Sequence, residues 1–413
     1  MIKFDKFSLD NGLRVIVHQD SSTPIVAINI IYDVGSRDEN PDKTGFAHLF
    51  EHLMFGGSVN IPKYDEPLQN VGGENNAFTN NDITNYYLTL PKQNIEIAFW
   101  LESDRMLDLA FSKKSLDVQR NVVSEEFRQN YLNQPYGDAW LMLKPLAYKV
   151  HPYRWPTIGK EISHIENAEM EDVRAFYKKY YNPNNAVLVV GGDVDLENIK
   201  HLAEKWFAPI PGGESFVRNL PKEPIQTKER KLKVERDVPT NVIHKAYHMS
   251  GRLDLDYYSS DLLSDILSNG DSSRLYQKLV KDQKLFIEIN AFLTGDFDEG
   301  LFVIIGKIAN GINVKVAEDA IINELEIICK EAIDEDELNK VKIKAESSLI
   351  FSEVNILNKT MNLAYFEILG DANLINLEIE KYKIISVDQI QKMANTIFRE
   401  ENCSTLYYLS KQE

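Results

Sequence analysis

The chain has 413 residues, of which 43% are hydrophobic and 26% charged, a globular composition long enough for two domains. Lysine and arginine total 46 against 63 aspartates and glutamates, so the formal net charge is −17. This acidic balance argues against nucleic acid or an anionic membrane as the main partner. No apolar run approaches the roughly 20 residues of a membrane span, and the N-terminus lacks the apolar core of a signal peptide. We expect a cytoplasmic protein, or a periplasmic one if an export signal has been trimmed.

Apolar runs, alternating or continuous, predict strands along the chain. These runs cover residues 25–32, 86–90 and 301–305. Helical patterns cover residues 95–106, 260–267, 314–332 and 336–351. Because strands and helices come in groups rather than in strict alternation, we expect an α+β fold with mainly antiparallel sheets.

The segment 45–57 lies between the first two predicted strands and is the most informative part of the sequence. It is an apolar run of about three helical turns that ends at two glycines. Within it, His48, Glu51 and His52 read H-x-x-E-H, the inverzincin signature. Residues four apart lie on one helical face, so both imidazoles can bind one metal ion while the carboxylate reaches a water on it. The alternative is a histidine pair without a metal, which is costly on a face otherwise made of Phe, Leu and Met.

A third metal ligand is expected in the segment 120–128, where Glu125 and Glu126 are adjacent. Spacing alone does not select one acidic residue. The H-x-x-E-H motif followed by this R-x-V-V-x-x-E segment resembles the M16 peptidases, the group of pitrilysin, insulin-degrading enzyme and mitochondrial processing peptidase. The resemblance implies that Glu126, 74 positions after His52, is the third ligand and that Glu125 is a solvated helix residue.

The likeness to this family extends over nearly the whole chain. The other matching segments are residues 8–15, 73–79, 82–87, 181–186, 189–193 and 270–275. The resemblance implies the short, M16B-like form with two homologous α+β domains. Each domain would be a mainly antiparallel sheet with helices, and the two would clasp a central chamber, as in LuxS/MPP-like metallohydrolases.

The domain boundary is predicted where proline, glycine and charge concentrate, as in a linker. We expect a zinc-binding domain at 1–210, a linker at 211–228 and a homologous domain at 229–413. A shift of 217 positions aligns the pattern near the end of the first half with that near the end of the second. Each is a helix followed by a buried strand, which predicts a duplicated unit.

The resemblance also implies the activity, that of a zinc metalloendopeptidase acting on peptides or unfolded segments. One Zn²⁺ per chain would be held by His48, His52 and Glu126, with a fourth position left for water. The water's pKa would fall toward about 7, and Glu51 would accept its proton as the general base.

A substrate-binding strand is expected next to this site. It consists of Asn76, Ala77, Phe78 and Thr79. The resemblance implies that their backbone groups bind an extended peptide as an added strand. Judged from the residues alone, Asn76 is equally a turn or strand-edge residue, and Phe78 equally a core residue.

Three positions depart from the family pattern. Gln119 stands where the family usually has a glutamate that supports the ligands, and an amide carries no charge. Val280 and Ile287 stand where many members have an Arg and a Tyr that stabilise the oxyanion, and one such donor contributes about 2.7–4 kcal/mol. We therefore expect the zinc-bearing subunit of a heterodimer whose homologous partner carries the Arg/Tyr pair.

Four alternatives stay open at this point. The chain can form a homodimer, use a rearranged oxyanion site, bind peptides with weak turnover of its own, or serve as a non-catalytic scaffold subunit. The complete set of histidines and glutamates argues against the scaffold.

Overall fold

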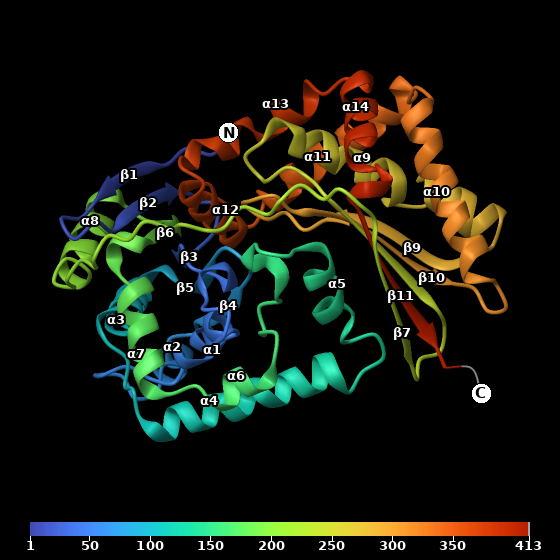
Figure 1. The fold of residues 1–413 in the computed structure, drawn as a ribbon. Coiled ribbons are helices and arrows are strands. Elements are labelled where there is room, and N and C mark those ends of the chain that lie inside the picture. Colours follow the sequence, from blue (N-terminus) through green and yellow to red (C-terminus); the bar gives the residue numbers. More distant parts are fainter. Residues whose placement is uncertain (412–413) are drawn as a thin grey trace. The chain divides into compact units, whose positions relative to one another are not determined.

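The computed structural model describes residues 1–411, which form two compact units (Figure 1). Unit 1 comprises Met1–Arg128, Trp155–Leu220 and Ile350–Leu377; unit 2 comprises Gln129–Arg154, Pro221–Leu349 and the chain from Glu378 onward. Each unit has one mainly antiparallel sheet with helices, which confirms the predicted fold class. The predicted linker at 211–228 contains no helix or strand. The domain boundaries at 210 and 229 stay a prediction.

Unit 1 is built on a six-stranded sheet with order β1-β2-β6-β3-β5-β4. Only β2 and β6 pair in parallel. The strands are β1 (Asp5–Ser8), β2 (Arg14–Gln19), β3 (Ile25–Tyr32), β4 (Glu74–Thr79), β5 (Thr84–Pro91) and β6 (Ala186–Gly192). The central strands β3 and β6 are apolar on both faces because helices cover both sides of the sheet. Strand β4 forms one edge.

Unit 1 has helices on both faces of its sheet. They are α1 (Phe46–Leu53), α2 (Asp65–Asn70), α3 (Ile95–Leu107), α4 (Lys113–Phe127), α6 (Ile162–Glu166), α7 (Met170–Tyr180), α8 (Leu196–Trp206) and α12 (Ile356–Ile368). Figure 1 shows α12 on one face of the sheet and α1, α3 and α7 on the other.

Unit 2 has a five-stranded sheet with order β7-β11-β8-β10-β9. Its strands are β7 (Arg230–Arg236), β8 (Val242–His248), β9 (Phe286–Leu293), β10 (Leu301–Ile308) and β11 (Cys403–Ser410). Its helices are α5 (Ala139–Ala147), α9 (Leu255–Ser268), α10 (Val314–Lys330), α11 (Glu335–Ser352, the last three residues of which belong to unit 1), α13 (Glu378–Lys383) and α14 (Val387–Ile397). Strands β7 and β11 pair in parallel and the remaining pairs are antiparallel, the same arrangement as β2, β6, β3, β5 and β4.

The two halves of the chain repeat with the predicted shift. Helices α7 and α14 begin and end 217 positions apart. Strands β6 and β11 begin 217 positions apart, and so do helices α5 and α12. The predicted strands fall within β3, β5 and β10, and three of the predicted helices fall within α3, α9 and α11. The helix predicted at 314–332 is α10, which ends two residues earlier, at Lys330.

The repeat has an unexpected feature, a reciprocal exchange of helices. Helix α5 from the first half covers the sheet of unit 2, where Leu143 and Ala147 join a core with Leu301 and Leu406. Helix α12 from the second half covers the sheet of unit 1. Its approach requires a glycine in β6: a Cβ on Gly191 would lie 2.5 Å from Cγ2 of Thr360. Each sheet is therefore completed by the other half of the chain.

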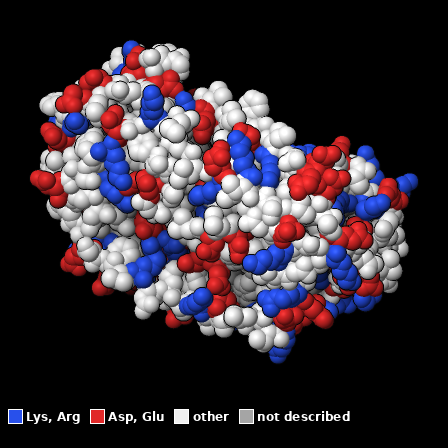
Figure 2. Space-filling model, turned by 90° about the horizontal axis from the view of Figure 1, so that it is seen from above, with Lys and Arg blue, Asp and Glu red and all other residues white. Residues whose placement is uncertain are grey.

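The surface carries charged side chains of both signs. Figure 2 shows acidic and basic side chains interspersed over the face seen from above. None of the helices within residues 1–411 combines the length and apolar character needed to cross a membrane.

Candidate metal centre

Helix α1 is anchored by an apolar face. The ring of Phe50 stacks on the rings of Phe176 and Tyr181, with centroids 5.0 and 5.1 Å apart. The buried residues of α1 are Phe46, Ala47, Leu49, Phe50 and Leu53. This packing fixes the rotation of the helix and leaves His48 and His52 only partly buried on the remaining surface.

The structure brings His48, His52 and Glu126 together. The Nε2 atoms of the two histidines are 3.3 Å apart. Oε2 of Glu126 lies 3.4 Å from Nε2 of His52 and 3.8 Å from Nε2 of His48. Tetrahedral ligands at zinc bond lengths are separated by about 3.3–3.4 Å, so these three donor atoms fit one zinc ion. Among the described residues, no other group of His, Cys, Asp or Glu side chains offers three donors this close.

The protonation states of the site suit metal binding. Burial and the nearby His52 together lower the pKa of the His48 imidazole to about 4, while Glu126 opposes the shift. A hydrogen bond with His52 lowers the pKa of the Glu126 carboxyl. His48 is therefore neutral and Glu126 ionised near pH 7, the forms in which both side chains bind metals.

The site is open to solvent on one side. The exposed fraction of the side chain rises from 15% at His48 to 25% at His52 and 36% at Glu126. A water molecule or a substrate can therefore reach the space in front of the three donor atoms.

Glu125 and Glu126 point to different environments. The side chain of Glu125 is 60% exposed and pairs with Arg128 at 2.5 Å. Glu126, one position on, lies against the two histidines. This difference agrees with the expectation that Glu126 is the ligand, although the metal-binding role itself stays a prediction.

Glu51 lies beside the three donors and contacts the edge strand. Its Oε2 accepts a hydrogen bond of 2.7 Å from Oγ1 of Thr79. Burial raises the pKa of the Glu51 carboxyl, while the Thr79 hydrogen bond and the neighbouring His52 lower it. A raised pKa and a fixed orientation both suit a general base. The sequence did not predict this hydrogen bond. It assigned Thr79 to the substrate-binding strand and gave its side chain no role.

The predicted substrate-binding residues lie on β4, the edge strand. Residues 74–79 alternate between exposed and partly buried side chains, and within the described part of the chain β4 pairs only with β5. Asn76 and Phe78 are on the exposed side, and Phe78 is 39% exposed, so Phe78 is not a core residue. The opposite edge of β4 pairs with no other strand among residues 1–411, as strand addition requires. On β4 the backbone N–H of Ala77 donates to Oδ1 of Asn76 at 2.8 Å.

The three departures from the family pattern lie at different places. Gln119 is half-buried on α4, and no hydrogen bond joins its side chain to the histidines within residues 1–411. The buried Nδ1 of His48 has no hydrogen-bond partner there either. In unit 2, Val280 packs against the apolar core, whereas Ile287 on β9 is 51% exposed. None of the three supplies a charge or a proton donor to the metal ligands.

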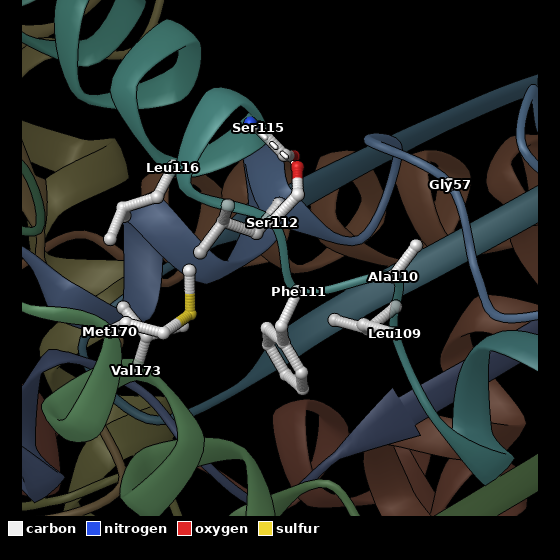
Figure 3. Close-up of a pocket in the computed structure, with 10 residues that line it drawn as sticks. Gly57, Leu109, Ala110, Phe111, Ser112, Ser115, Leu116, Met170 and Val173 are labelled. Atoms are coloured by element: carbon white, nitrogen blue, oxygen red, sulfur yellow. Dashed lines mark hydrogen bonds between the residues drawn. The ribbon is translucent and has the colours of Figure 1, made fainter.

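A small cavity is lined by residues of α1, α4 and α7 and of the segment between α3 and α4 (Figure 3). Its volume is about 10 Å³, and its lining includes Leu53 of α1, Phe111, Leu116 of α4 and Met170 of α7. This volume admits at most about one water molecule, so the cavity is a packing gap and no substrate pocket. Figure 3 also shows Ser112, whose hydroxyl accepts a hydrogen bond from the backbone of Ser115 and caps α4.

Comparison with known proteins shows what the chain is similar to. Residues 14–156 match the family model described as "Insulinase (Peptidase family M16)", and residues 167–344 match "Peptidase M16 inactive domain". The zinc protease PqqE of Helicobacter pylori is 28% identical over 411 residues, covering 98% of this chain and 92% of the relative. The mitochondrial-processing peptidase subunit beta of Saccharomyces cerevisiae is 27% identical over 361 residues, covering 83% and 77%.

Solved structures share the fold. A protease from Helicobacter pylori has a TM-score of 0.94 at 27% identity, covering 99% of this chain and 100% of that one. Pitrilysin has a TM-score of 0.77 at 17% identity and is covered over 45% of its length. The second likeness concerns the fold alone.

Proposed function

Because the chain belongs to peptidase family M16, we propose that it is a zinc metalloendopeptidase that cleaves peptides or unfolded segments. The observation that carries the proposal is the convergence of two imidazole nitrogens and one carboxylate oxygen within 3.3–3.8 Å. Relatives named zinc proteases support both the metal and the class of reaction.

His48, His52 and Glu126 would hold one Zn²⁺ per chain. A zinc ion bound there would polarise the carbonyl group of the scissile bond and make a water molecule more acidic. Two neutral imidazoles and one carboxylate leave a net positive charge at the ion, which favours attack by water.

Glu51 moves the proton. Its carboxylate takes a proton from the attacking water as the new C–O bond forms, and gives it to the amine nitrogen as the C–N bond breaks. Thr79 holds one oxygen of Glu51 in place. The free edge of β4 orients the peptide by backbone hydrogen bonds, with Asn76 and Phe78 beside it.

The test combines metal analysis with peptide hydrolysis. We expect one zinc per purified chain and cleavage of unstructured peptides that a chelator abolishes. Glu51→Gln should retain the zinc and the fold but lose hydrolysis, because the amide cannot accept the proton. Substantial hydrolysis by Glu51→Gln would show that Glu51 is not the base, and absence of zinc from the wild type would favour a non-catalytic scaffold.

We further propose that the chain is the zinc-bearing subunit of a heterodimer with a homologous subunit that carries an Arg/Tyr pair. Val280 and Ile287 cannot donate a hydrogen bond to a developing oxyanion, and one relative is named as a subunit of a processing peptidase. Co-purification from the native source should recover such a partner. Robust turnover by the chain alone, unchanged by a partner, would instead favour a homodimer or a rearranged oxyanion site.

A further inference from the structure

We propose that Glu39 is a positioning residue for the metal centre: its carboxylate holds the first turn of α1 and thereby sets where His48 and His52 lie. The inference rests on the proposed function in one respect: its test by zinc affinity requires that the site binds zinc. It concerns a residue that lies outside the H-x-x-E-H motif and contacts neither histidine.

The carboxylate of Glu39 is buried at the start of α1. Glu39 is 6% exposed. Its Oε2 accepts a hydrogen bond of 2.9 Å from the backbone N–H of Gly45, and its Oε1 accepts one of 2.9 Å from that of Ala47. The first N–H groups of a helix have no partner within the helix, so the two oxygens of Glu39 accept from donors that the helix itself leaves unpaired. Burial raises the pKa of this carboxyl to about 8, although the hydrogen bonds from Ala47 and Gly45 oppose the shift. Ala47 directly precedes His48, so the contact is one residue from a predicted ligand.

Helix α1 depends on this distant acceptor because its own cap position must be glycine. Gly45 has φ 87° and makes no side-chain capping bond. A Cβ at this position would lie 2.7 Å from the carbonyl oxygen of Ile158. Ser, Thr, Asp or Asn, the usual capping residues, are therefore excluded, and Glu39 supplies the missing acceptor from six positions earlier.

The loop before α1 is itself held in place. The Oη of Tyr180 donates to the carbonyl of Asp38 at 3.0 Å, and Nε of Arg218 pairs with Oδ1 of Asp38 at 2.7 Å. At the other end of the loop, the backbone N–H of Thr44 donates to Nδ1 of His164 at 3.0 Å. A fixed loop can transmit a fixed position to α1, whereas a mobile loop could not.

The short length of α1 makes its first turn important for the ligands. The helix has eight residues, and His48 is the third of them. Loss of the contacts at Gly45 and Ala47 would loosen the turn that carries His48, while His52 would stay anchored by the packing of Phe50. The two Nε2 atoms would then no longer hold their 3.3 Å separation.

A second buried carboxylate provides the matched control. Glu223 in unit 2 is also 6% exposed and accepts backbone hydrogen bonds of 2.7, 2.9 and 2.9 Å from Lys149, Val150 and His151. It therefore resembles Glu39 in exposure and in accepting backbone N–H groups, but it has no contact with α1. The pKa of the Glu39 carboxyl is raised by burial, whereas backbone hydrogen bonds lower that of Glu223 against the effect of its burial. A general loss of stability should follow from either change, whereas an effect on the metal centre should follow only from the change at Glu39.

The experiment compares Glu39→Gln with Glu223→Gln. Zinc affinity is measured by competition with a chelator, and hydrogen exchange of the peptide covering residues 46–53 is measured on the metal-free chain. We expect Glu39→Gln to lower zinc affinity by about 10- to 100-fold, as for groups that support ligands, and to speed exchange in α1. Glu223→Gln should change neither quantity.

Wild-type zinc affinity and wild-type exchange of residues 46–53 in Glu39→Gln would overturn the inference. Should Glu39→Gln fail to fold, Glu39→Asp, which keeps the carboxyl group on a shorter side chain, should show a smaller loss in both measurements. If the wild type binds no zinc, the proposed function fails. The exchange measurement still tests the role of Glu39: faster exchange of residues 46–53 in Glu39→Gln supports it, and unchanged exchange contradicts it.

Discussion

Thr79 donates its hydroxyl hydrogen to Oε2 of Glu51 across 2.7 Å. One residue of the edge strand β4 therefore connects the expected peptide-binding strand to the expected general base. A peptide that added to β4 would lie next to a carboxylate whose orientation that strand already controls. The contact gives Thr79 a role beyond the backbone binding that the sequence predicted.

We predict that Thr79→Val lowers kcat by about 10- to 100-fold, because a hydrogen bond to a charged group contributes about 1.5–3 kcal/mol. Zinc content and thermal stability should stay close to wild type, since Thr79 is no ligand. Steady-state kinetics with an unstructured peptide measure the effect. Thr79→Ser keeps the hydroxyl and should retain most of the activity; a Val variant with wild-type kcat would rule out the role.

The two adjacent glutamates of α4 should differ in their effect on zinc. Glu126→Gln should reduce bound zinc strongly, because it removes the charged donor 3.4 Å from His52. Glu125→Gln should leave zinc content unchanged, because that side chain is 60% exposed and pairs with Arg128. Metal analysis of both purified variants is the measurement. Equal zinc loss in the two variants, or none in either, would mean that the third ligand is misassigned.

Acid should destabilise unit 2 through His244. Burial lowers the pKa of this imidazole to about 4, while a hydrogen bond with the backbone of Leu406 opposes the shift. The unfolded chain takes up a proton below pH of about 6.5, whereas the folded chain does so only near 4. The free energy of unfolding should therefore decrease as pH falls from about 6.5 to 4, by up to about 3 kcal/mol from this group.

The His244→Gln variant isolates that contribution. The difference in unfolding free energy between wild type and variant, measured in urea at pH 7 and at pH 4.5, should shrink at the lower pH. A change at the exposed His201 serves as the control. A difference that is the same at both pH values would contradict the assignment.

The contact between β6 and α12 predicts a destabilising substitution with a specific rescue. Gly191→Ala should lower the free energy of unfolding by about 1–3 kcal/mol, because the added methyl overlaps Cγ2 of Thr360. Thr360→Ser removes Cγ2 but keeps the hydroxyl that donates to the carbonyl of Leu357 at 2.7 Å. The double variant should recover part of the loss, which denaturant unfolding of all four chains would show as a coupling energy. If the effects of the two substitutions on the free energy of unfolding were additive, the overlap between the added methyl and Thr360 would not be the cause of the destabilisation.

Much of the fold and part of the site could be predicted because their signals are local. The helical spacing of His48 and His52 and the apolar run of β3 each depend on neighbouring residues. Glu126 could be chosen as the third ligand only from the resemblance to a family, since nothing in its own segment distinguishes it from Glu125. The partners of Glu39 and Thr79 depend on loop and strand positions that no periodicity encodes. Gly45 was the one sequence signal that pointed toward Glu39. A glycine directly before an apolar helix has no side chain to cap the helix, so an acceptor from elsewhere in the chain is expected.

The exchange of α5 and α12 has a consequence for the origin of this architecture. A protein made of a single repeat would present a sheet face that its own helix does not cover. It would bury that face by trading helices with a second copy, as in a domain-swapped dimer. Fusion of two such genes would turn an association that depends on protein concentration into one within a single chain. After such a fusion, one repeat could lose its metal ligands without harm to the other. The repeat that keeps the ligands needs only the exchanged helix from its neighbour.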